Sequence, residues 1–214
     1  RCSRDWSSDV CSSDLAEAFY LTDVKDASKW VVKKFLPGRL LDRSYLDRIG
    51  TLIPAHPAFV AGTSRSVLNP ADVRVSNRGL AQWFGGTVLM PQLPGSDWSD
   101  VADRIRDGVA IGDDRRMEWA RQLAEAVATL EDAGVAHRDL SGGNVYVDTD
   151  ANTVALIDWD SFYHPTLEMP ANTTLGTAGY IAPFVHPTSP LGATWRPDAD
   201  RFALAACIAE LLLM

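Results

Sequence analysis

A short polar motif between two apolar segments constrains the fold of this chain more than any other feature. Residues 137–144 read His-Arg-Asp-Leu-Ser-Gly-Gly-Asn, and a second motif, Asp-Trp-Asp, begins at Asp158. The carboxylate of Asp139 can orient an attacking hydroxyl and accept its proton, as phosphoryl transfer requires. The amide oxygen of Asn144 and the carboxylate of Asp158 are hard oxygen ligands of the kind that Mg²⁺ prefers. The order of these groups therefore predicts a phosphoryl-transfer centre.

The segments around this motif predict the local fold. Residues 117–130 carry apolar side chains at steps of three and four, which indicates a helix whose buried face is formed by Met117, Ala120, Leu123, Ala124, Val127 and Leu130. Gly134 is expected to end this helix. Residues 145–147 and 154–157 predict two strands joined by a polar turn at 148–152. Such a hairpin would place the two predicted metal ligands on opposite sides of one cation.

Two downstream segments extend the pattern. Residues 176–183 read Gly-Thr-Ala-Gly-Tyr-Ile-Ala-Pro, and residues 198–213 open with Asp-Ala-Asp and continue as a strongly apolar helix. With the motifs described above, these segments resemble protein kinases, in particular bacterial protein kinases of the eukaryotic serine/threonine type. The resemblance covers residues 17–214 and is densest over 117–205. It implies a two-lobed α+β fold, with a small antiparallel sheet in the N-lobe and a mainly helical C-lobe.

The resemblance also assigns roles to individual residues. Asp139 would be the catalytic base, and Asn144 would be both a catalytic residue and, with Asp158, a ligand of Mg²⁺. His137 is expected to brace the loop rather than to transfer a proton. In this family an aspartate at the position of Asp200 accepts hydrogen bonds from the backbone of the catalytic loop, so the same is expected here.

Upstream residues resemble the nucleotide-binding half of the family more loosely. Trp-Val-Val-Lys, ending at Lys33, is similar to the V-A-I-K strand, which makes Lys33 the catalytic candidate that binds the α- and β-phosphates of ATP. Only one of two adjacent lysines in a strand can face a cleft. Asp47 stands where the family has the glutamate that pairs with this lysine. Residues 56–60 resemble the turn and strand after the regulatory helix. Met90 would guard the rear of the adenine pocket, and the backbone at Leu93 would contact adenine.

Three departures from the family pattern bear on activity. Ser141 replaces a lysine that neutralises phosphate charge, Asp160 replaces the glycine of D-F-G, and Phe184 replaces a glutamate that anchors the activation segment. These departures favour one alternative, a pseudokinase or ATP-binding scaffold. Residues 156–159 are also similar to small-molecule kinases of the aminoglycoside and choline phosphotransferase type, although residues 176–183 favour a protein acceptor.

Arg138 has a further expected role. In this family an arginine before the catalytic aspartate can receive a phosphate from the activation segment, and residues 161–177 offer Thr173 and Thr174 as acceptors. A phosphate on either threonine would pair with Arg138 and order the segment.

The two ends of the chain depart from a complete kinase domain. Residues 1–15 resemble the translation of a sequencing-library adapter, so we leave them out of the expected fold. No glycine-rich loop precedes residues 16–21, and the chain stops in an apolar helix at Met214. We therefore predict a domain truncated at both ends, with a partial N-lobe at 16–93 and a partial C-lobe at 94–214. Whether such a fragment is itself active is left open.

Composition limits the remaining classes of function. A net charge of −8 over 214 residues argues against non-specific nucleic-acid binding, which needs a basic surface. Outside residues 1–15 only Cys207 remains, so we expect neither disulfides nor a zinc site, which fits a cytoplasmic protein. No apolar run reaches the roughly 18 residues that a membrane-spanning helix needs. ATP, Mg²⁺ and a protein substrate are predicted, whereas the substrate's identity, the activating signal and the oligomeric state are left open.

Overall fold

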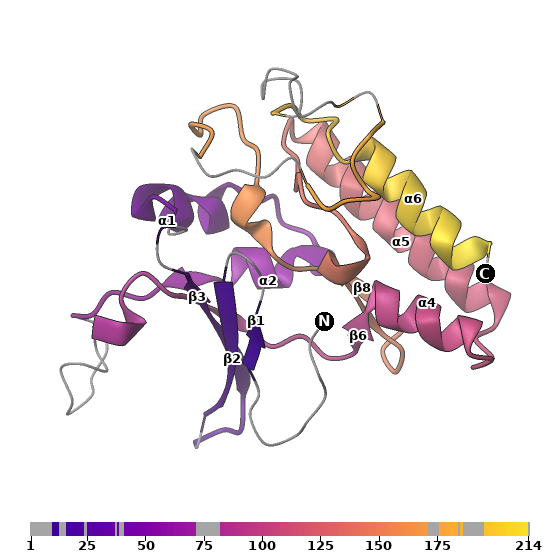
Figure 1. Ribbon diagram of the computed structural model, residues 1–214, viewed down its shortest axis with the longest axis horizontal. Helices are drawn as coiled ribbons and strands as arrows, with labels where there is room; N and C mark the ends of the chain where they lie inside the picture. Colours follow the sequence, from indigo (N-terminus) through magenta and orange to yellow (C-terminus); the bar gives the residue numbers. More distant parts are fainter. Residues whose placement is uncertain are drawn as a thin grey trace. The chain divides into compact units, whose positions relative to one another are not determined.

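The computed structural model describes residues 10–12, 16–23, 25–36, 38, 41–71, 82–170, 176–183, 185 and 195–213 (Figure 1). The chain divides into two compact units. One comprises Arg1–Thr51 and Ser64–Gln92, and the other comprises Leu52–Thr63 and Leu93–Met214. The sequence analysis places residues 52–63 in the N-lobe, whereas their contacts group them with the second unit.

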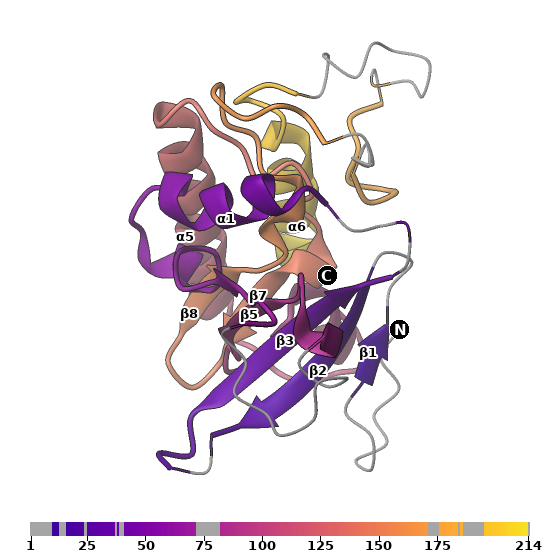
Figure 2. The same ribbon diagram turned by 90° about the vertical axis from the view of Figure 1, so that its left-hand side faces the viewer.

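The first unit is built on a five-stranded antiparallel sheet with the order β1-β2-β3-β5-β4. Its strands are β1 (Val10–Ser12), β2 (Ala16–Thr22), β3 (Lys29–Phe35), β4 (Ser66–Val67) and β5 (Val88–Pro91). Figure 2 shows β1, β2 and β3 side by side. The helix α1 (Arg43–Leu52) buries one face, formed by Tyr45, Leu46 and Ile49. The small antiparallel sheet predicted for the N-lobe is confirmed.

The strand β1 corrects one expectation. Residues 1–15 are not part of the expected fold, but Val10 pairs with Phe19 and Ser12 pairs with Glu17 on β2. The edge of a sheet presents a row of N–H and C=O groups, so an extended neighbouring segment can add to it whatever its sequence.

The register between β3 and β5 separates two adjacent lysines. Lys33 pairs with Val88 and therefore shares a face of the sheet with Met90, which lies two residues further along β5. Lys34 lies on the opposite face, where its Nζ is 4.1 Å from the centre of the Trp83 ring. Of the two lysines, Lys33 is the one that shares a face with the residue predicted to guard the adenine pocket.

The second unit combines helices with a three-stranded sheet in the order β6-β7-β8. Its elements are η1 (Pro57–Phe59), α2 (Val60–Thr63), β6 (Ser96–Asp97), α4 (Trp98–Arg106), α5 (Asp113–Asp132), η2 (Gly142–Asn144), β7 (Val145–Asp148), β8 (Thr153–Leu156), η3 (Trp159–Ser161) and α6 (Arg201–Leu212). Gly134, with φ of 71°, follows α5 as expected. The predicted order of helix, loop and hairpin is confirmed.

Residues 56–60 differ from the expected turn and strand, because they form helical turns. His56 caps η1 through its Nδ1, which accepts the N–H of Ala58 at 3.2 Å. Pro57 follows in the first turn, where its fixed φ and missing N–H suit a helix start. These two residues begin a helix, which accounts for the difference.

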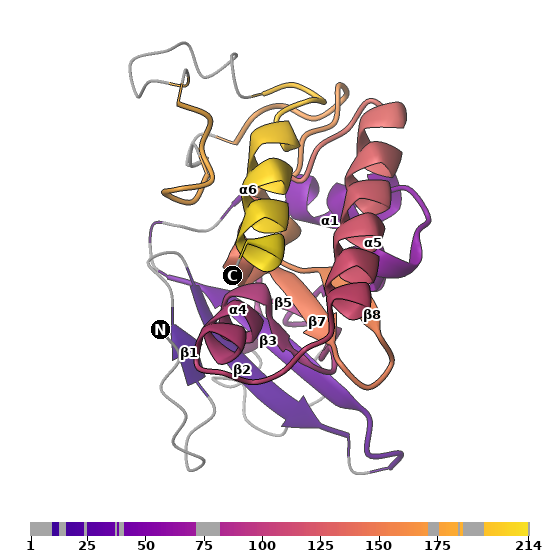
Figure 3. The same ribbon diagram turned by 90° about the vertical axis from the view of Figure 1, so that its right-hand side faces the viewer.

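Helices α5 and α6 lie side by side in the second unit (Figures 1 and 3). Trp119 and Leu123 of α5 are fully buried, as are Cys207 and Leu211 of α6. The indole N–H of Trp98, the first residue of α4, donates to the carbonyl of Cys207 at 3.0 Å and joins a third helix to the pair. None of the helices in the described ranges has both the length and the apolar character needed to cross a membrane.

The exposed side chain of Met117 corrects the predicted buried face of α5. Met117 is 56% exposed, whereas Trp119 is fully buried. Successive residues of an α-helix are rotated by about 100°, so Trp119 aligns with Leu123, Ala126 and Leu130 while Met117 points elsewhere. The predicted set of six apolar residues therefore begins about one turn before the buried face of the helix does.

A close backbone approach fixes the entry into β6. Gly95 has φ of 94°, and a Cβ atom at this position would lie 2.1 Å from the carbonyl oxygen of Val147. Gly108 has nearly the same conformation, with φ of 92°, but a Cβ atom there would meet nothing within 4 Å. The two glycines share a backbone requirement and differ in the space around them.

We therefore expect Gly95→Ala to destabilise the protein far more than Gly108→Ala. Left-handed strain costs each variant about 1–2 kcal/mol, and the clash with the Val147 carbonyl should bring the total for Gly95→Ala to about 3–5 kcal/mol. Chemical denaturation would measure both free energies of unfolding. Equal losses would show that the contact between Gly95 and β7 relaxes at little cost.

Candidate active site

A buried carboxylate binds the backbone of the loop His137–Asn144, which we call the catalytic loop. Asp200, which is 2% exposed, accepts the backbone N–H of His137 at 2.6 Å and that of Arg138 at 2.7 Å. Burial raises the pKa of the Asp200 carboxyl, although the electrostatic interaction with His137 and the two N–H bonds act in the opposite direction. Arg138 has φ of 70°, a left-handed conformation that is uncommon outside glycine. The role expected for Asp200 is confirmed by these two bonds.

His137 ties the catalytic loop to the end of β8. Its Nε2 lies 2.7 Å from the carbonyl oxygen of Ile157, and its Nδ1 accepts the N–H of Asp139 at 3.4 Å. Because Nδ1 accepts, a neutral ring carries its proton on Nε2 and donates it to Ile157. Trp159 packs against the imidazole with 4.8 Å between ring centres. Both ring nitrogens of this buried histidine are thus engaged with backbone, which suits a brace.

The base of the β7–β8 hairpin brings Asn144 close to Asp158. The N–H of Ile157 donates to the carbonyl of Asn144 at 3.0 Å, which extends the strand ladder by one pair. Asp158 follows directly. The Nδ2 of Asn144 donates to the carbonyl of Asp139 at 2.7 Å, so the amide nitrogen faces the loop and its oxygen points away.

These two side chains form a donor set that fits a hard cation. Mg²⁺ binds carboxylate and carbonyl-type oxygens and is usually held by one or two protein groups together with substrate phosphates. Asn144 offers its amide oxygen because the nitrogen is committed to the loop. Asp158 adopts φ of 62° and ψ of 61°, a strained conformation of the kind that concentrates at ligand sites. The predicted ligands thus sit at adjoining positions of one hairpin.

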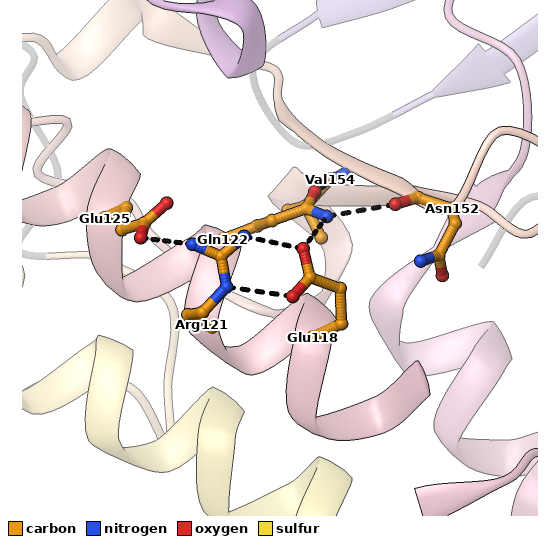
Figure 4. A network of polar contacts seen from close by, with 6 residues as sticks. All are labelled: Glu118, Arg121, Gln122, Glu125, Asn152 and Val154. Atoms are coloured by element: carbon orange, nitrogen blue, oxygen red, sulfur yellow. Dashed lines mark hydrogen bonds and ion pairs between the residues drawn. The ribbon is translucent and has the colours of Figure 1, made fainter. Parts of the chain in front are cut away.

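A polar network fastens this hairpin to α5 (Figure 4). The Nε2 of Gln122 donates to the carbonyl of Asn152 at 3.0 Å, and its Oε1 accepts the N–H of Val154 at 3.0 Å. Glu118 accepts from both Gln122 and Arg121, and these bonds, chiefly that from Arg121, lower its pKa to about 2. The amide of Gln122 therefore hydrogen-bonds to backbone groups at the edge of β8, as a neighbouring strand would.

Thr177 connects the 176–183 segment to the catalytic loop. Its hydroxyl donates to Oδ1 of Asp139 at 2.8 Å. A hydrogen bond to a carboxylate is stronger than one between neutral groups, so this contact fixes the orientation of Asp139. The sequence predicted both residues as parts of motifs but gave no sign that they bond to each other.

Tyr180 anchors the same segment to α6. Its hydroxyl lies 3.0 and 2.9 Å from the two carboxylate oxygens of Glu210 and donates to that group. Burial, followed by this hydrogen bond, raises the pKa of Tyr180 to about 12. No sequence motif points to Glu210, because it lies on an otherwise apolar helix.

The structure describes two of the three residues that depart from the family pattern. Ser141 is buried, with 3% of its surface exposed, and Asp160 is partly buried in η3. Phe184, Thr173 and Thr174 lie outside the described residues.

The remaining residues predicted for the active site lie far from the catalytic loop in the sequence. Lys33 and Met90 share one face of the first unit's sheet, and Leu93 begins the main part of the second unit. Asp47, which stands where the family has the glutamate that pairs with the lysine, forms an ion pair with Arg43 at 3.3 Å on the exposed side of α1. The two are one helical turn apart, a spacing at which opposite charges attract, so the local partner takes the carboxylate.

The comparisons with known proteins agree with this geometry. A family model described as the protein kinase domain matches residues 88–214. The chain is 30% identical over 146 residues to a probable serine/threonine-protein kinase zyg-1 of Caenorhabditis briggsae, covering 64% of this chain and 20% of that protein. It is 31% identical over 147 residues to serine/threonine-protein kinase Nek6 of Oryza sativa subsp. japonica, covering 69% of this chain and 26% of that protein.

A more distant relative is the human mitogen-activated protein kinase kinase kinase 6, which is 21% identical over 146 residues, 64% of this chain and 11% of that protein. The chain thus spans about a quarter or less of the length of these curated relatives.

Removing the buried carboxylate of Asp200 should destabilise the second unit. In Asp200→Ala the N–H groups of His137 and Arg138 lose their acceptor while buried, so we expect a loss of about 2–4 kcal/mol in the free energy of unfolding. Asp198→Ala is the matched control, because it removes a partly exposed carboxylate paired with Arg196 at 2.9 Å and should cost under about 1 kcal/mol. Urea denaturation of both variants measures the difference, and similar losses would contradict the role assigned to Asp200.

Proposed function

The chain belongs to the protein kinase domain family, and from this premise we propose that it transfers the γ-phosphate of ATP to serine and threonine hydroxyls of proteins. The hydrogen bond between Thr177 and Asp139 carries the proposal, because it joins the segment that positions a protein substrate in this family to the predicted catalytic carboxylate. The serine/threonine kinases among the relatives support the same acceptor class.

The residues of the second unit have separate roles in phosphate transfer. Asp139 orients the acceptor hydroxyl for in-line attack on the γ-phosphorus and takes its proton as the new bond forms. Asn144 and Asp158 would hold Mg²⁺, which would neutralise charge on the phosphates. His137 and Asp200 keep the loop in one conformation, so the carboxylate needs little reorganisation when substrates arrive.

The first unit supplies the nucleotide contacts in this proposal. Lys33 holds the α- and β-phosphates, Met90 closes the rear of the adenine pocket, and the backbone at Leu93 contacts adenine. The shared face of Lys33 and Met90 supports these roles. Asp47 is engaged with Arg43, so the proposal does not pair it with Lys33.

A pseudokinase is the second candidate, and one observation favours it. Ser141, at the position where the family pattern has lysine, is buried and brings no positive charge to the transferring phosphate. An ATP-binding scaffold without turnover would tolerate this loss, whereas a kinase would need compensation. The intact set of Asp139, Asn144 and Asp158 favours turnover, and the tie between Thr177 and Asp139 favours a protein acceptor over a small molecule.

The substrate class, the location and the subfamily of the protein are also part of the proposal. The sequence resemblance implies a protein substrate and a place among bacterial kinases of the eukaryotic type. A single cysteine outside residues 1–15 fits a cytoplasmic location. A net charge of −8 argues against non-specific binding to nucleic acid.

Phosphate transfer from γ-labelled ATP in the presence of Mg²⁺ tests the proposal directly. Label should appear on the protein itself or on a generic protein substrate. Asp139→Ala and Asp158→Ala should each reduce transfer by at least about a hundredfold, since they remove the proton acceptor and a metal ligand. Asp103→Ala, on the exposed side of α4 beside Arg106, is the control and should match the wild type.

Two outcomes would count against the proposal. Undiminished transfer in Asp158→Ala would contradict the metal assignment. ATP binding without transfer to protein would favour the pseudokinase or, if a small acceptor becomes labelled, the small-molecule kinase.

The hydroxyl of Thr177 should matter for the rate rather than for ATP binding. Thr177→Val keeps the shape of the side chain but removes the bond to Asp139, and hydrogen bonds to charged groups are worth about 1.5–3 kcal/mol, so kcat should fall by about tenfold or more. Thr177→Ser keeps the hydroxyl and should retain most of kcat. Steady-state kinetics with a protein acceptor would measure both variants. Equal activity of the valine and serine variants would show that the bond does not position Asp139.

A further inference from the structure

An aromatic ring covers the cation next to the catalytic aspartate. Arg138 directly precedes Asp139 and is 5% exposed. The carbon at the centre of its guanidinium group lies 4.8 Å from the ring centre of Trp195. At this distance a cation is attracted by the face of an indole, and the attraction is strongest where water is excluded. Trp195 therefore holds the side chain of a residue whose backbone shapes the catalytic loop.

Trp195 also contacts the strand segment that enters the loop. Its ring meets that of Tyr163 nearly edge to face, with 5.3 Å between centres and 86° between planes. Tyr163 in turn is paired by backbone with Ala136, with bonds of 2.8 and 3.2 Å. Ala136 lies two residues before Arg138, so a single indole bridges the side chain of Arg138 and the segment that pairs with the entry to the loop.

The conformation of Arg138 explains why two supports would be needed. Its φ of 70° is a strained conformation for a residue with a Cβ atom, and such a conformation persists only where the surroundings determine it. Asp200 binds its backbone N–H at 2.7 Å, which fixes the chain on one side. The ring of Trp195 fixes the side chain on the other. If the backbone of Arg138 relaxed to a more common conformation, the peptide bond that joins it to Asp139 would rotate.

We propose that Trp195 is a positioning residue for phosphate transfer, which holds Arg138 in its left-handed conformation and so presents the carboxylate of Asp139. This inference rests on the proposed function. It assigns Trp195 no contact with ATP or with the acceptor. Loss of the ring should therefore lower kcat while leaving the KM for ATP close to that of the wild type.

A double-mutant cycle separates positioning from general packing. Trp195→Ala should lower kcat by about tenfold, the size expected for a desolvated cation–π contact. Trp195→Phe keeps an aromatic face and should restore most of the loss. Arg138→Met keeps the length of the side chain but removes its charge. In that background Trp195→Ala should have little further effect, because the two residues act as one unit.

Arg115→Ala is the matched control for the loss of a cation–π pair. The guanidinium carbon of Arg115 lies 5.3 Å from the ring centre of Trp119, on α5, and Arg115 is not part of the proposed machinery. This variant should keep the wild-type kcat. Wild-type kcat in Trp195→Ala, or losses that multiply in the double variant, would overturn the inference.

Hydrogen exchange provides a second measurement that does not require turnover. The amides of residues 137–140 should exchange several-fold faster in Trp195→Ala and regain slow exchange in Trp195→Phe, because the loop opens more often without the ring. Unchanged exchange would contradict the inference. A wild-type protein that transfers no phosphate would instead contradict the proposed function, and the exchange data would still decide whether Trp195 holds the loop.

Discussion

The buried carboxylate of Asp200 is the interaction on which the rest of the site depends. It lies at the start of α6 and accepts two backbone N–H groups of the catalytic loop, from His137 and Arg138. A buried carboxylate is costly unless its oxygens are satisfied, and a buried N–H is costly without an acceptor. Each side of the contact therefore needs the other. Because α6 packs along α5, the helix pair and the loop form one structure.

From this fixed point the site is built by short hydrogen bonds to backbone carbonyl groups. His137 bonds to Ile157, Ile157 pairs with Asn144, and Asn144 bonds to Asp139. The circuit closes on the catalytic loop and adjoins both predicted metal ligands, because Asn144 is one of its members and Asp158 directly follows Ile157. The chemistry is thus held by main-chain geometry, which suits catalysis by positioning.

The parts of this site that could be predicted from the sequence are local. The catalytic loop, the hairpin and the helix before them follow from one motif and its flanking periodicities, since every step spans few residues. The contacts of Thr177 with Asp139 and of Tyr180 with Glu210 could not be predicted, because no motif or periodicity links these pairs. The contact of Asp200 with the catalytic loop spans more residues still and was expected only because the family resemblance implies it. Local competition explains why Asp47 follows the helix rather than the family pattern, because Arg43 lies one helical turn away and forms an ion pair with it.

The most direct test of the central claim is the affinity for Mn²⁺, a spectroscopic substitute for Mg²⁺, in the presence of a non-hydrolysable ATP analogue. If Asn144 and Asp158 bind one cation from adjoining positions of the hairpin, Asn144→Ala and Asp158→Ala should each weaken Mn²⁺ binding by at least about tenfold. Gln122→Ala, which loosens the hairpin without removing a ligand, should weaken it less. Wild-type affinity in both ligand variants would contradict the account of this site.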